Sequence, residues 1–428
     1  MLVAGASAPV VSAAQSHETT LVSEGCGPKS DFSGDVALSV DGRSVAFDCK
    51  SGRDPYEVFV ADRATGQTTL VSRASGAFDE PANADSSGPS LSADGRFVAF
   101  SSRASNLTAD DTDQTADVFV RDLASGTTAL VSRASGEAGP KEDAGAYVSP
   151  SISADGRLVA FESKATNLSP DDQDDTVDVY VRDLGSSTTT LVSRASGIQG
   201  VKSNGTTFLA SPSISSDGRF VAFQSDATNL SGAKRGPYRA IFVRDLAANT
   251  TALATRANGI HGAGLAGLSY DPVISANGRF VAFSFQPCGG LICSFRQNVY
   301  VRDLRLHRLI LASRASGRHG AKSNFDGSVV PSISADGRRV AFTSDADNLT
   351  PGLQDTPFYD VFVRDLRSHT TILASRARRG HGANGNGDSG DASISGAGRL
   401  VAFPSTATDL APNSPHGGIF VRKLDRTS

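Results

Sequence analysis

The chain has 428 residues, a formal net charge of −4 and a sequence pI of about 6.0, with 43 glycines, one methionine and no tryptophan. This balance gives no electrostatic drive toward nucleic acid or an anionic membrane, so we expect no nucleic-acid partner. No stretch reaches the roughly 18 apolar residues that span a bilayer, and no apolar stretch of helical period stands out, so we expect an all-β protein without a membrane span.

The N-terminal residues are small and apolar. Residues 1–14 read MLVAGASAPVVSAA, and Ser12-Ala13-Ala14 would serve as the cleavage site of a secretory signal peptide. The basic segment that normally precedes such a region is missing, so the stretch is either a truncated signal peptide or an apolar tail. We assign residues 1–16 to this leader and residues 17–428 to the folded domain, and expect an extracellular or periplasmic monomer.

Seven stretches share one pattern. Residues 89–100 read PSLSADGRFVAF, in which Asp-Gly separates two β-prone runs and predicts a hairpin with a type I′ turn. The turn recurs at spacings of 53 to 62 residues and is followed each time by Gly-Arg. Its positions are Asp41, Asp94, Asp155, Asp217, Asn277, Asp336 and Ala397. A fixed period predicts an array of one supersecondary unit.

The second repeat serves as a template for the unit. Strand a is expected at 90–92, strand b at 97–101, strand c at 117–123 (DVFVRDL) and strand d at 127–132 (TTALVS). Strands b and c are apolar at consecutive positions, which is typical of a sheet that is covered on both faces. Four short strands in a regular array predict a β-propeller.

The two ends of the chain are offset by one strand. The last repeat stops at FVRKLDRTS without a strand d, whereas residues 18–23 (ETTLVS) match strand d and precede the first strand a. We therefore expect a seven-bladed propeller of four-stranded blades in which the N-terminal strand completes the last blade. An open solenoid would need polar caps, which we do not find.

The SxDGRxVAF stretches followed by DVFVRD resemble the WD-like propeller repeat of the TolB type, over essentially everything after the leader. TolB carries an additional α/β domain ahead of its propeller, and prolyl oligopeptidases carry a catalytic domain beside theirs; we find a counterpart of neither. The resemblance implies a secreted or periplasmic propeller that acts as a binding platform, and it implies nothing about the ligand.

The loops divide into two groups. The a-b and c-d turns are short and uniform and should share one face, whereas the b-c and d-a loops are long and variable and should share the other. Variable loops on a rigid scaffold usually carry recognition, so we expect binding at the b-c/d-a face. On the uniform face, the arginine of each DGR should pair with the aspartate of RD in strand c, such as Asp122, Asp183 and Asp245.

Two b-c loops are acidic and repeat each other at an offset of 61 residues. Hard oxygen ligands at alternate positions suit calcium, the one cofactor that the sequence suggests. The candidate ligands are Asp111, Asp113 and Asp117 in the first loop and Asp172, Asp174 and Asp178 in the second. The loops lack the glycine and terminal glutamate of an EF-hand. The alternative is a solvated acidic loop, or one that pairs with Arg133 and Arg194.

The residue just before each strand a should lie near the central channel. The seven residues are Asp35, Gly88, Ser149, Ser211, Asp271, Val330 and Asp391. Asp35, Asp271 and Asp391, with Ser149 and Ser211, form a candidate binding site at the channel mouth. A ring of carboxylates could hold a cation or a basic group of a ligand. Capping of loop backbone is the alternative role.

The four cysteines fall into two local pairs, Cys26 with Cys49 and Cys288 with Cys293. Local pairs indicate disulfides and an oxidising compartment, and four unrelated thiols are the alternative. A second local pattern is Asn-Leu-Ser/Thr, which begins at Asn106, Asn167, Asn229 and Asn348. Its recurrence at one blade position predicts that the asparagine bonds the loop backbone while the leucine plugs the loop.

The sequence carries no catalytic signature, since we find no GxSxG, HExxH, phosphate-loop or Cys-His motif. We predict no catalytic residue and expect a non-catalytic propeller that binds a protein or a cell-envelope polymer. The alternative is a carbohydrate-active hydrolase or lyase that uses the channel-mouth carboxylates. Aromatic content of 7% argues mildly against a sugar platform. A purely scaffolding role is the third reading.

Overall fold

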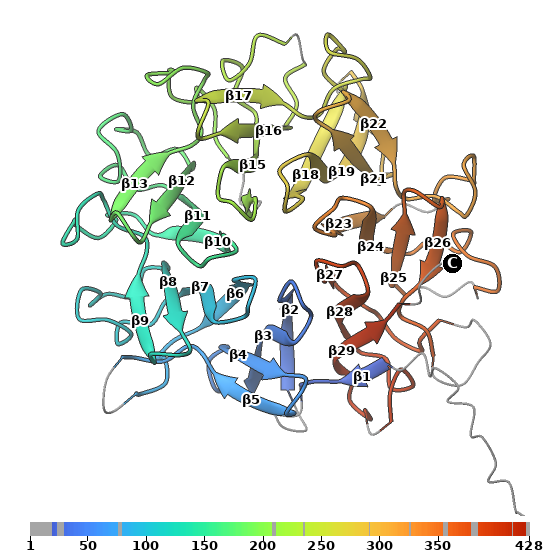
Figure 1. The fold of residues 1–428 in the computed structure, drawn as a ribbon, viewed down its shortest axis with the longest axis horizontal. Coiled ribbons are helices and arrows are strands. Elements are labelled where there is room, and N and C mark those ends of the chain that lie inside the picture. Colours follow the sequence, from blue (N-terminus) through green and yellow to red (C-terminus); the bar gives the residue numbers. More distant parts are fainter. Residues whose placement is uncertain are drawn as a thin grey trace, which may run out of the picture.

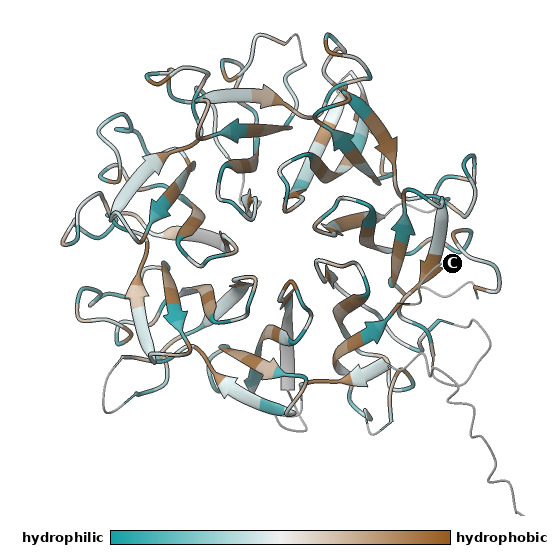
Figure 2. Cartoon of the chain, in the orientation of Figure 1, coloured by the Kyte–Doolittle hydropathy of each residue, from teal (hydrophilic) through white to brown (hydrophobic). Residues whose placement is uncertain are grey.

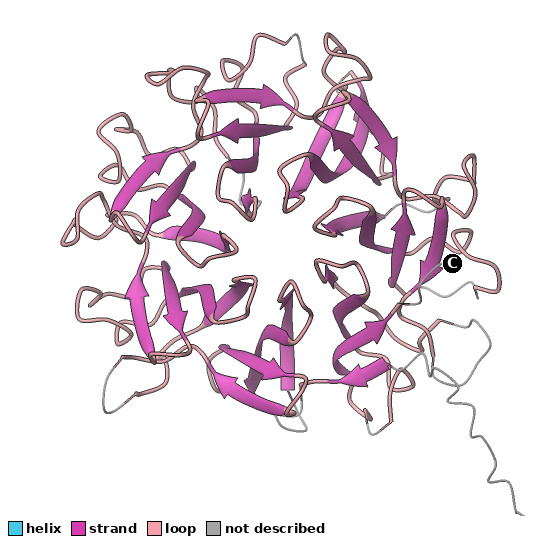
Figure 3. Cartoon of the chain, in the orientation of Figure 1, coloured by secondary structure: helices cyan, strands magenta, loops and turns pink. Residues whose placement is uncertain are grey.

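The computed structural model describes residues 19–23, 30–75, 79–207, 211–233, 236–290, 292–324, 327–353, 358–377, 384–412 and 414–424. Every regular element in these segments is a β-strand (Figure 3). A search of the same segments finds no helix with the length and apolar character needed to cross a membrane.

Seven antiparallel sheets surround a central channel (Figure 1), and each has its four main strands ordered from the axis outward as a, b, c and d. Strands a are β2 (Ser30–Leu38), β6 (Ser86–Leu91), β10 (Ala146–Ile152), β14 (Ser213–Ile214), β18 (Gly267–Ile274), β23 (Ser328–Ile333) and β27 (Ser393–Ile394). Strands b are β3 (Ser44–Ser51), β7 (Phe97–Ser102), β11 (Leu158–Ser163), β15 (Phe220–Ser225), β19 (Phe280–Gly289), β24 (Arg339–Ser344) and β28 (Leu400–Ser405).

Strands c are β4 (Glu57–Asp62), β8 (Asp117–Asp122), β12 (Asp178–Asp183), β16 (Ala240–Asp245), β21 (Asn298–Asp303), β25 (Asp360–Asp365) and β29 (Gly418–Lys423). Strands d are β5 (Gln67–Leu70), β9 (Thr127–Leu130), β13 (Thr188–Leu191), β17 (Thr250–Leu253), β22 (Arg308–Leu311), β26 (Thr370–Leu373) and, in the last blade, β1 (Thr19–Leu21). A short extra strand, β20 (Ile292–Cys293), pairs with β19 in blade 5. Blade 1 begins at β2, and blade 7 consists of β27, β28, β29 and β1.

The N-terminal strand closes the ring, as the sequence predicted. Strand β1 pairs antiparallel with β29, with Leu21 opposite Phe420. The buried guanidinium of Arg422 donates to the hydroxyl of Thr19 at 2.8 Å. Blades 7 and 1 are also joined near the axis, where the Gly396 amide donates to the Val40 carbonyl at 2.9 Å. The closing strand is therefore part of a continuous seam from rim to axis.

The hydrophobic core lies between the blades, which explains why strands b and c are apolar at consecutive positions. Val118 and Val120 of blade 2 pack in one cluster with Val159 and Phe161 of blade 3. Within each blade the strand b phenylalanine faces an aromatic ring on strand c, as Phe161 faces Tyr180 at a centroid distance of 5.7 Å. In Figure 2 hydrophobic colours are concentrated in the strands. Both faces of each sheet are thus covered by neighbouring blades.

The a-b turns differ from the predicted type I′ geometry. The glycine of each turn has positive φ, for example 72° at Gly95, whereas none of the aspartates before it does. The aspartate instead acts through its side chain, because Oδ1 of Asp94 accepts from the Ser92 hydroxyl at 2.7 Å and from the Arg96 amide at 3.0 Å. A Cβ on Gly95 would also collide with Ser44 of the preceding blade. The motif therefore fixes both the turn and the contact between blades.

The predicted Arg-Asp pairs are present in six blades. The shortest N–O distance is 2.7 Å in blades 1 to 5 and 3.0 Å in blade 6. In blade 7 the aspartate is replaced by Lys423, so Arg399 has no such partner. This particular Arg-Asp pair is therefore present in every blade except the one that closes the ring.

A second arginine, near the end of strand c, donates hydrogen bonds to the loop that follows the preceding blade. Arg182 is 3% exposed and donates to the carbonyls of Ala134 at 2.8 Å and Gly136 at 3.0 Å. The equivalent buried residues are Arg121, Arg244, Arg302 and Arg364. Blade 1 has Ala61 there, and a cavity of about 220 Å³ opens between Ala61 and β1. The hydrogen bonds of these strand c arginines to the preceding blade were not predicted from the sequence.

The d-a loops do not lie wholly on the b-c side, which corrects the expected division of the loops. Their first part turns back to the c-d turn of the following blade. The Gly197 amide donates to the Asn249 carbonyl at 2.7 Å, and the Gly259 amide donates to the His307 carbonyl at 2.8 Å. Part of each such loop therefore lies beside the uniform turns at the rim.

Candidate functional site

The residues predicted at the channel mouth lie within strand a or, in blades 4 and 7, just before it, where the backbone is irregular. The register between strands a and b shifts around Asp35 in blade 1 and around Asp271 in blade 5. A bulge of this kind removes a residue from the ladder and re-aims its side chain. Asp271 has φ of 51° and the equivalent Val330 of blade 6 has φ of 45°. The bulges hold these side chains out of the sheets.

The structure brings the three channel carboxylates of Asp35, Asp271 and Asp391 within electrostatic reach of one another. Burial, and to a lesser extent the neighbouring carboxylates of Asp35 and Asp271, together raise the pKa of Asp391 to about 7. Burial alone raises the pKa of Asp271 to about 6. Partial desolvation and like charge both disfavour the ionised form, so this site holds protons close to neutral pH.

The channel-mouth serines have different surroundings. Burial raises the pKa of Asp35, and a hydrogen bond from Ser149 of blade 3 partly offsets this effect. The residue between them in the ring is Gly88 of blade 2, where a Cβ would collide with Ser149. The glycine therefore leaves room for the serine to reach the carboxylate. Ser211 takes the same position in blade 4 and is partly buried.

The acidic loop of blade 2 surrounds a lysine. The ammonium of Lys141 lies 2.7 Å from Asp111, 2.8 Å from Asp113 and 2.8 Å from Asp117. Burial lowers the pKa of Lys141, but the three carboxylates raise it more and hold it above its usual range. The ammonium in turn lowers the pKa of Asp113 to about 2. The cation that the cluster needs is thus supplied by the chain.

Blade 3 repeats this arrangement. The ammonium of Lys202 lies 3.2 Å from Asp172, 2.7 Å from Asp174 and 2.8 Å from Asp178. Burial raises the pKa of Asp178 to about 6, against the effect of Lys202. The predicted alternative partners are present as well, since Arg194 pairs with Asp171 at 2.9 Å and Arg133 with Asp110 at 2.8 Å.

Both acid clusters have the spacing of groups that could hold a metal ion. Their donor sets fit calcium only after the ammonium has left, because it already contacts all three carboxylates. The sequence offered a signal for these lysines that we missed: Lys141 and Lys202 are separated by 61 residues, the same offset as the acids. Each is positioned by the loop asparagine that we did predict, because Asn167 donates to the Lys141 carbonyl at 2.8 Å and Asn229 to the Lys202 carbonyl at 2.7 Å.

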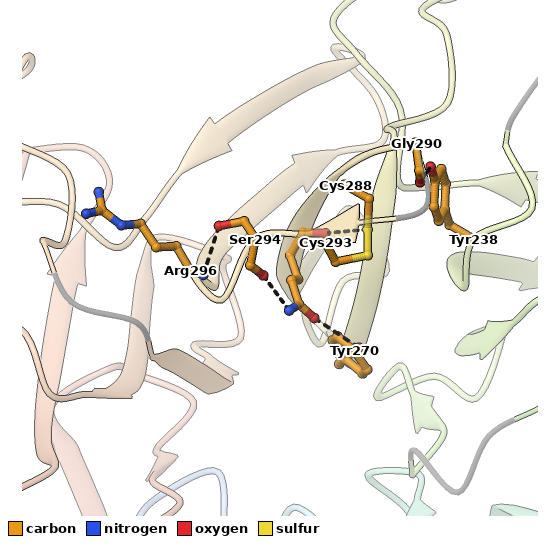
Figure 4. Close-up of a disulfide and its surroundings, with 8 residues drawn as sticks. Tyr238, Tyr270, Cys288, Gly290, Cys293, Ser294 and Arg296 are labelled. Atoms are coloured by element: carbon orange, nitrogen blue, oxygen red, sulfur yellow. Dashed lines mark hydrogen bonds between the residues drawn. A yellow bond between two sulfur atoms is a disulfide. The ribbon is translucent and has the colours of Figure 1, made fainter.

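A disulfide hairpin rises from the b-c side of blade 5 (Figure 4), where Cys288 is bonded to Cys293 as predicted. The hairpin is held by Tyr238, whose hydroxyl donates to the Gly290 carbonyl at 2.5 Å. Cys49 is also disulfide-bonded. Its predicted partner, Cys26, lies outside the described residues, so that pairing stays a prediction.

Two exposed apolar side chains project from this hairpin region. Ile292 is 80% exposed and Phe295 is 85% exposed. The base of the hairpin is bonded to the innermost strand, because Gln286 accepts a hydrogen bond from Tyr270, the residue before Asp271, at 3.3 Å. The b-c side of blade 5 therefore carries exposed apolar side chains on a segment whose base is hydrogen-bonded to the strand that contains Asp271.

The sequence matches no protein-family model and no curated protein. Solved structures share the fold, and TolB structures are among them, as the repeat motif suggested. TolB from Acinetobacter baumannii is 15% identical over 79% of this chain, with a TM-score of 0.44, and this chain spans 62% of its length.

Two protease structures are also similar. The propeller domain of the Trilobed protease from Pyrococcus furiosus is 11% identical over 92% of this chain and 94% of its own, with a TM-score of 0.52. A prolyl endopeptidase is 13% identical over 93% of this chain and 51% of its own, with a TM-score of 0.52. At these identities the likeness shows the fold alone. The Trilobed protease propeller is described as having an open velcro topology, whereas here β1 closes the ring.

Proposed function

We propose that this chain is a non-catalytic binding propeller that receives a cationic group of a protein or cell-envelope polymer at its channel mouth. One observation carries the proposal: Asp35, Asp271 and Asp391 form a carboxylate site without an ion pair to any described residue. A primary amine or a guanidinium entering this site would relieve the repulsion among the carboxylates.

The surroundings of the site favour a protein partner over a bare ion. Ile292 and Phe295 are exposed in the disulfide-hairpin region of blade 5, whose base is hydrogen-bonded to Tyr270 beside Asp271. Exposed apolar side chains next to a charged site are typical of a surface that contacts another macromolecule. A basic side chain in the channel and an apolar contact on the hairpin would together define a docking orientation.

The test is binding of a labelled tetralysine peptide, measured by fluorescence anisotropy. Asp271→Asn with Asp391→Asn should weaken binding at least about tenfold, because two of the three carboxylates are lost. The matched control is Asp54→Asn with Asp175→Asn, which removes two exposed carboxylates of b-c loops. Affinity for the wild-type protein should rise between pH 5 and pH 8. Equal affinity of the two double variants, or a flat pH profile, would refute the proposal.

The enzymatic alternative rests on the pKa of Asp391, which is about 7. A carboxyl group that titrates near neutral pH can act as a general acid, and a neighbouring carboxylate can act as a base or nucleophile in glycoside cleavage. Turnover of a polysaccharide panel that disappears in both Asp271→Asn and Asp391→Asn would replace the binding-only function by a carbohydrate-active enzyme.

We propose an extracellular or periplasmic location for this propeller, with residues 1–16 as the leader and residues 17–428 as the domain. The Cys288–Cys293 disulfide supports an oxidising compartment. Peptide mapping under non-reducing conditions should also recover Cys26 bonded to Cys49. Free thiols at both positions in secreted protein would contradict this assignment.

A further inference from the structure

The turn face, which we define as the a-b and c-d turns with the strand ends beside them, is electrically divided. In blades 1 to 4 its cationic side chains are Arg43, Arg63, Arg96, Arg157 and Arg219. Its acidic side chains there are more numerous: Asp41, Asp62, Asp94, Asp122, Asp155, Asp183, Asp217 and Asp245. This half of the ring is acidic.

Blades 5 to 7 reverse the balance among the described residues. Their cationic side chains on the turn face are Arg279, Arg305, Arg308, Arg338, Arg339, Arg367, Arg399 and Lys423. Their acidic side chains there are Asp303, Asp336 and Asp365. The chain as a whole carries a net charge of −4, so this concentration of positive charge runs against the overall composition.

Five of these cations form what we call the basic crescent: Arg305, Arg308, Arg367, Arg399 and Lys423. All five are exposed, and their side chains form no ion pair with another described residue. By contrast, Arg279 is paired with Asp303 at 2.7 Å and Arg338 with Asp365 at 3.0 Å. The basic crescent therefore spans three blades and retains its charge for a partner.

An apolar cavity opens at one end of the basic crescent, between blades 4 and 5. It has a volume of about 260 Å³, and its walls include Phe220, Val243, Leu253 and Leu304. His307 also lines it, which ties the cavity to the crescent because its chain neighbours are Leu306 and Arg308. Ile260 at the wall is 60% exposed.

We propose that the basic crescent and this cavity together dock an acidic peptide segment of a partner protein, with one apolar side chain of the peptide in the cavity. The crescent consists mainly of arginines, whose planar guanidinium groups match carboxylates in a bidentate geometry. A charged strip over three blades extends beyond the screening length of about 8 Å at physiological salt, so it fits an extended ligand rather than a small anion.

The cavity decides between a peptide and other polyanions. A sulfated or phosphorylated polymer would use the arginines but would leave an apolar cavity with nothing to bind. An acidic peptide with a leucine or phenylalanine uses both features, in the way that anchor residues fill pockets within a polar surround. The docking surface is separate from the channel site, because it consists mainly of turns and of residues on the outer strands c and d, whereas the channel residues lie in or just before the innermost strand a.

The first experiment uses a fluorescein-labelled peptide of twelve glutamates and glycines with a central leucine. Binding to Arg305→Glu with Arg308→Glu and Arg367→Glu should be at least about tenfold weaker than to the wild-type protein. The matched control, Arg53→Glu with Arg103→Glu and Arg296→Glu, reverses three exposed cations on b-c loops and should bind as the wild type does. Binding should weaken with salt, and binding of a lysine version of the peptide, which the channel carboxylates can attract, should not be weakened by the Arg305→Glu, Arg308→Glu and Arg367→Glu triple variant. Equal binding to the two triple variants would overturn the proposal.

The second experiment tests the cavity with Ala252→Phe, a substitution on an exposed strand position at the cavity wall. The wild-type protein should prefer the leucine peptide over a version with alanine at its centre, and the variant should lose this preference. Heparin and vesicles of anionic lipid serve as the alternative partners. Binding of either that matches the peptide, together with no effect of Ala252→Phe, would overturn the proposal in favour of a general polyanion surface. Melting curves of all variants confirm that they are folded.

Discussion

Two regions of the molecule each contain three aspartates, and they differ in whether a cation of the chain lies among the carboxylates. In blade 2 the cluster of Asp111, Asp113 and Asp117 surrounds the ammonium of Lys141. At the channel mouth, Asp35 and Asp271 lie near enough to act electrostatically on Asp391, and no described residue supplies such a cation. The first cluster contains a cation from its own chain, whereas the second keeps protons near neutral pH.

The difference separates a structural cluster from a binding site. Carboxylates that hold a lysine of their own chain stabilise the loops that carry them, because the cation is always present. Carboxylates that repel one another cost stability, and the fold retains them at three separate blades. Carboxylates held close together on a rigid scaffold are expected at sites where a ligand supplies a positive charge. The predictions below test each half of this contrast.

The largest effect should come from removing the internal cation. Lys141→Met leaves Asp111 and Asp117, both fully buried, without their partner. Breaking a buried ion pair in this way costs about 3–5 kcal/mol, so the melting temperature at pH 7 should fall sharply. Lys202→Met should behave alike in blade 3. Part of the loss should be regained at acid pH, where the carboxylates become neutral.

The matched control is Lys322→Met, at the equivalent position of blade 6, where the lysine is exposed and forms no ion pair with a described residue. It should change the melting temperature little. Calcium gives a further comparison: millimolar calcium should restore stability to Lys141→Met with Lys202→Met, because the ion replaces the ammonium. If calcium raises the melting temperature of the wild-type protein strongly, the ion displaces the lysines from the two clusters.

The next effect should have the opposite sign. The pKa of Asp391 is about 7 in the folded protein, against about 3.9 in the unfolded chain, so its contribution to stability is lost as pH rises from about 4 to 7. Asp391→Asn should therefore stabilise the protein by about 2 kcal/mol at pH 8 and should have no such effect at pH 4. Thermal melts at the two pH values measure this. Destabilisation at pH 8 would mean that the carboxylate caps loop backbone, which is the alternative role.

The architecture was predictable because the same sequence motif recurs in each of the seven blades. The DGR turns, the consecutive apolar residues of strands b and c, and the missing last strand d together predict seven blades and closure by the N-terminal strand. The turn type was wrong, because Asp94 and its equivalents act through their side chains instead of adopting positive φ. A local motif indicates a hairpin, but the side-chain bonds of the turn and its contact with the preceding blade select its geometry.

The sites were less predictable because their chemistry combines residues from different repeats. The sequence was enough to group Asp35, Asp271 and Asp391, because they occupy equivalent positions beside strand a and strand a lies nearest the axis in every blade. The lysine inside each acidic loop comes from the d-a segment that follows, about 30 residues later, and a reading of one loop alone misses it. The basic crescent is harder still, because it emerges only when turns of three blades are compared.

A smaller effect is expected at Glu142, which lies beside the blade 2 cluster. Burial, together with the charge of Asp117, raises the pKa of Glu142 well above its usual value. Stability therefore declines as pH rises above about 4.3, where the unfolded chain ionises. Glu142→Gln should remove this penalty and keep the hydrogen bond from Ser163, giving a gain on the order of 1 kcal/mol at pH 7.

The control for Glu142→Gln is Glu137→Gln, an exposed residue of the same loop. It should leave the melting temperature unchanged at every pH. If Glu142→Gln lowers the melting temperature at pH 7, the carboxyl group is ionised in the folded protein and belongs to the acids that neutralise Lys141.

The smallest effect should follow from replacing the exposed aspartate of each lysine cluster by asparagine. Asp113 and Asp174 are 55% and 54% exposed, so water screens their attraction to Lys141 and Lys202. Exposed ion pairs contribute about 0.2–1 kcal/mol, and each aspartate also accepts a hydrogen bond from the threonine two residues later. Asp113→Asn with Asp174→Asn should therefore lower the melting temperature slightly at pH 7, and more at low salt than at high salt. The two fully buried aspartates of each cluster should continue to hold the lysine. A loss as large as that of Lys141→Met would mean that the exposed acid, and not the buried pair, holds the ammonium in place, and the contrast with the channel site would then rest on surface charge alone.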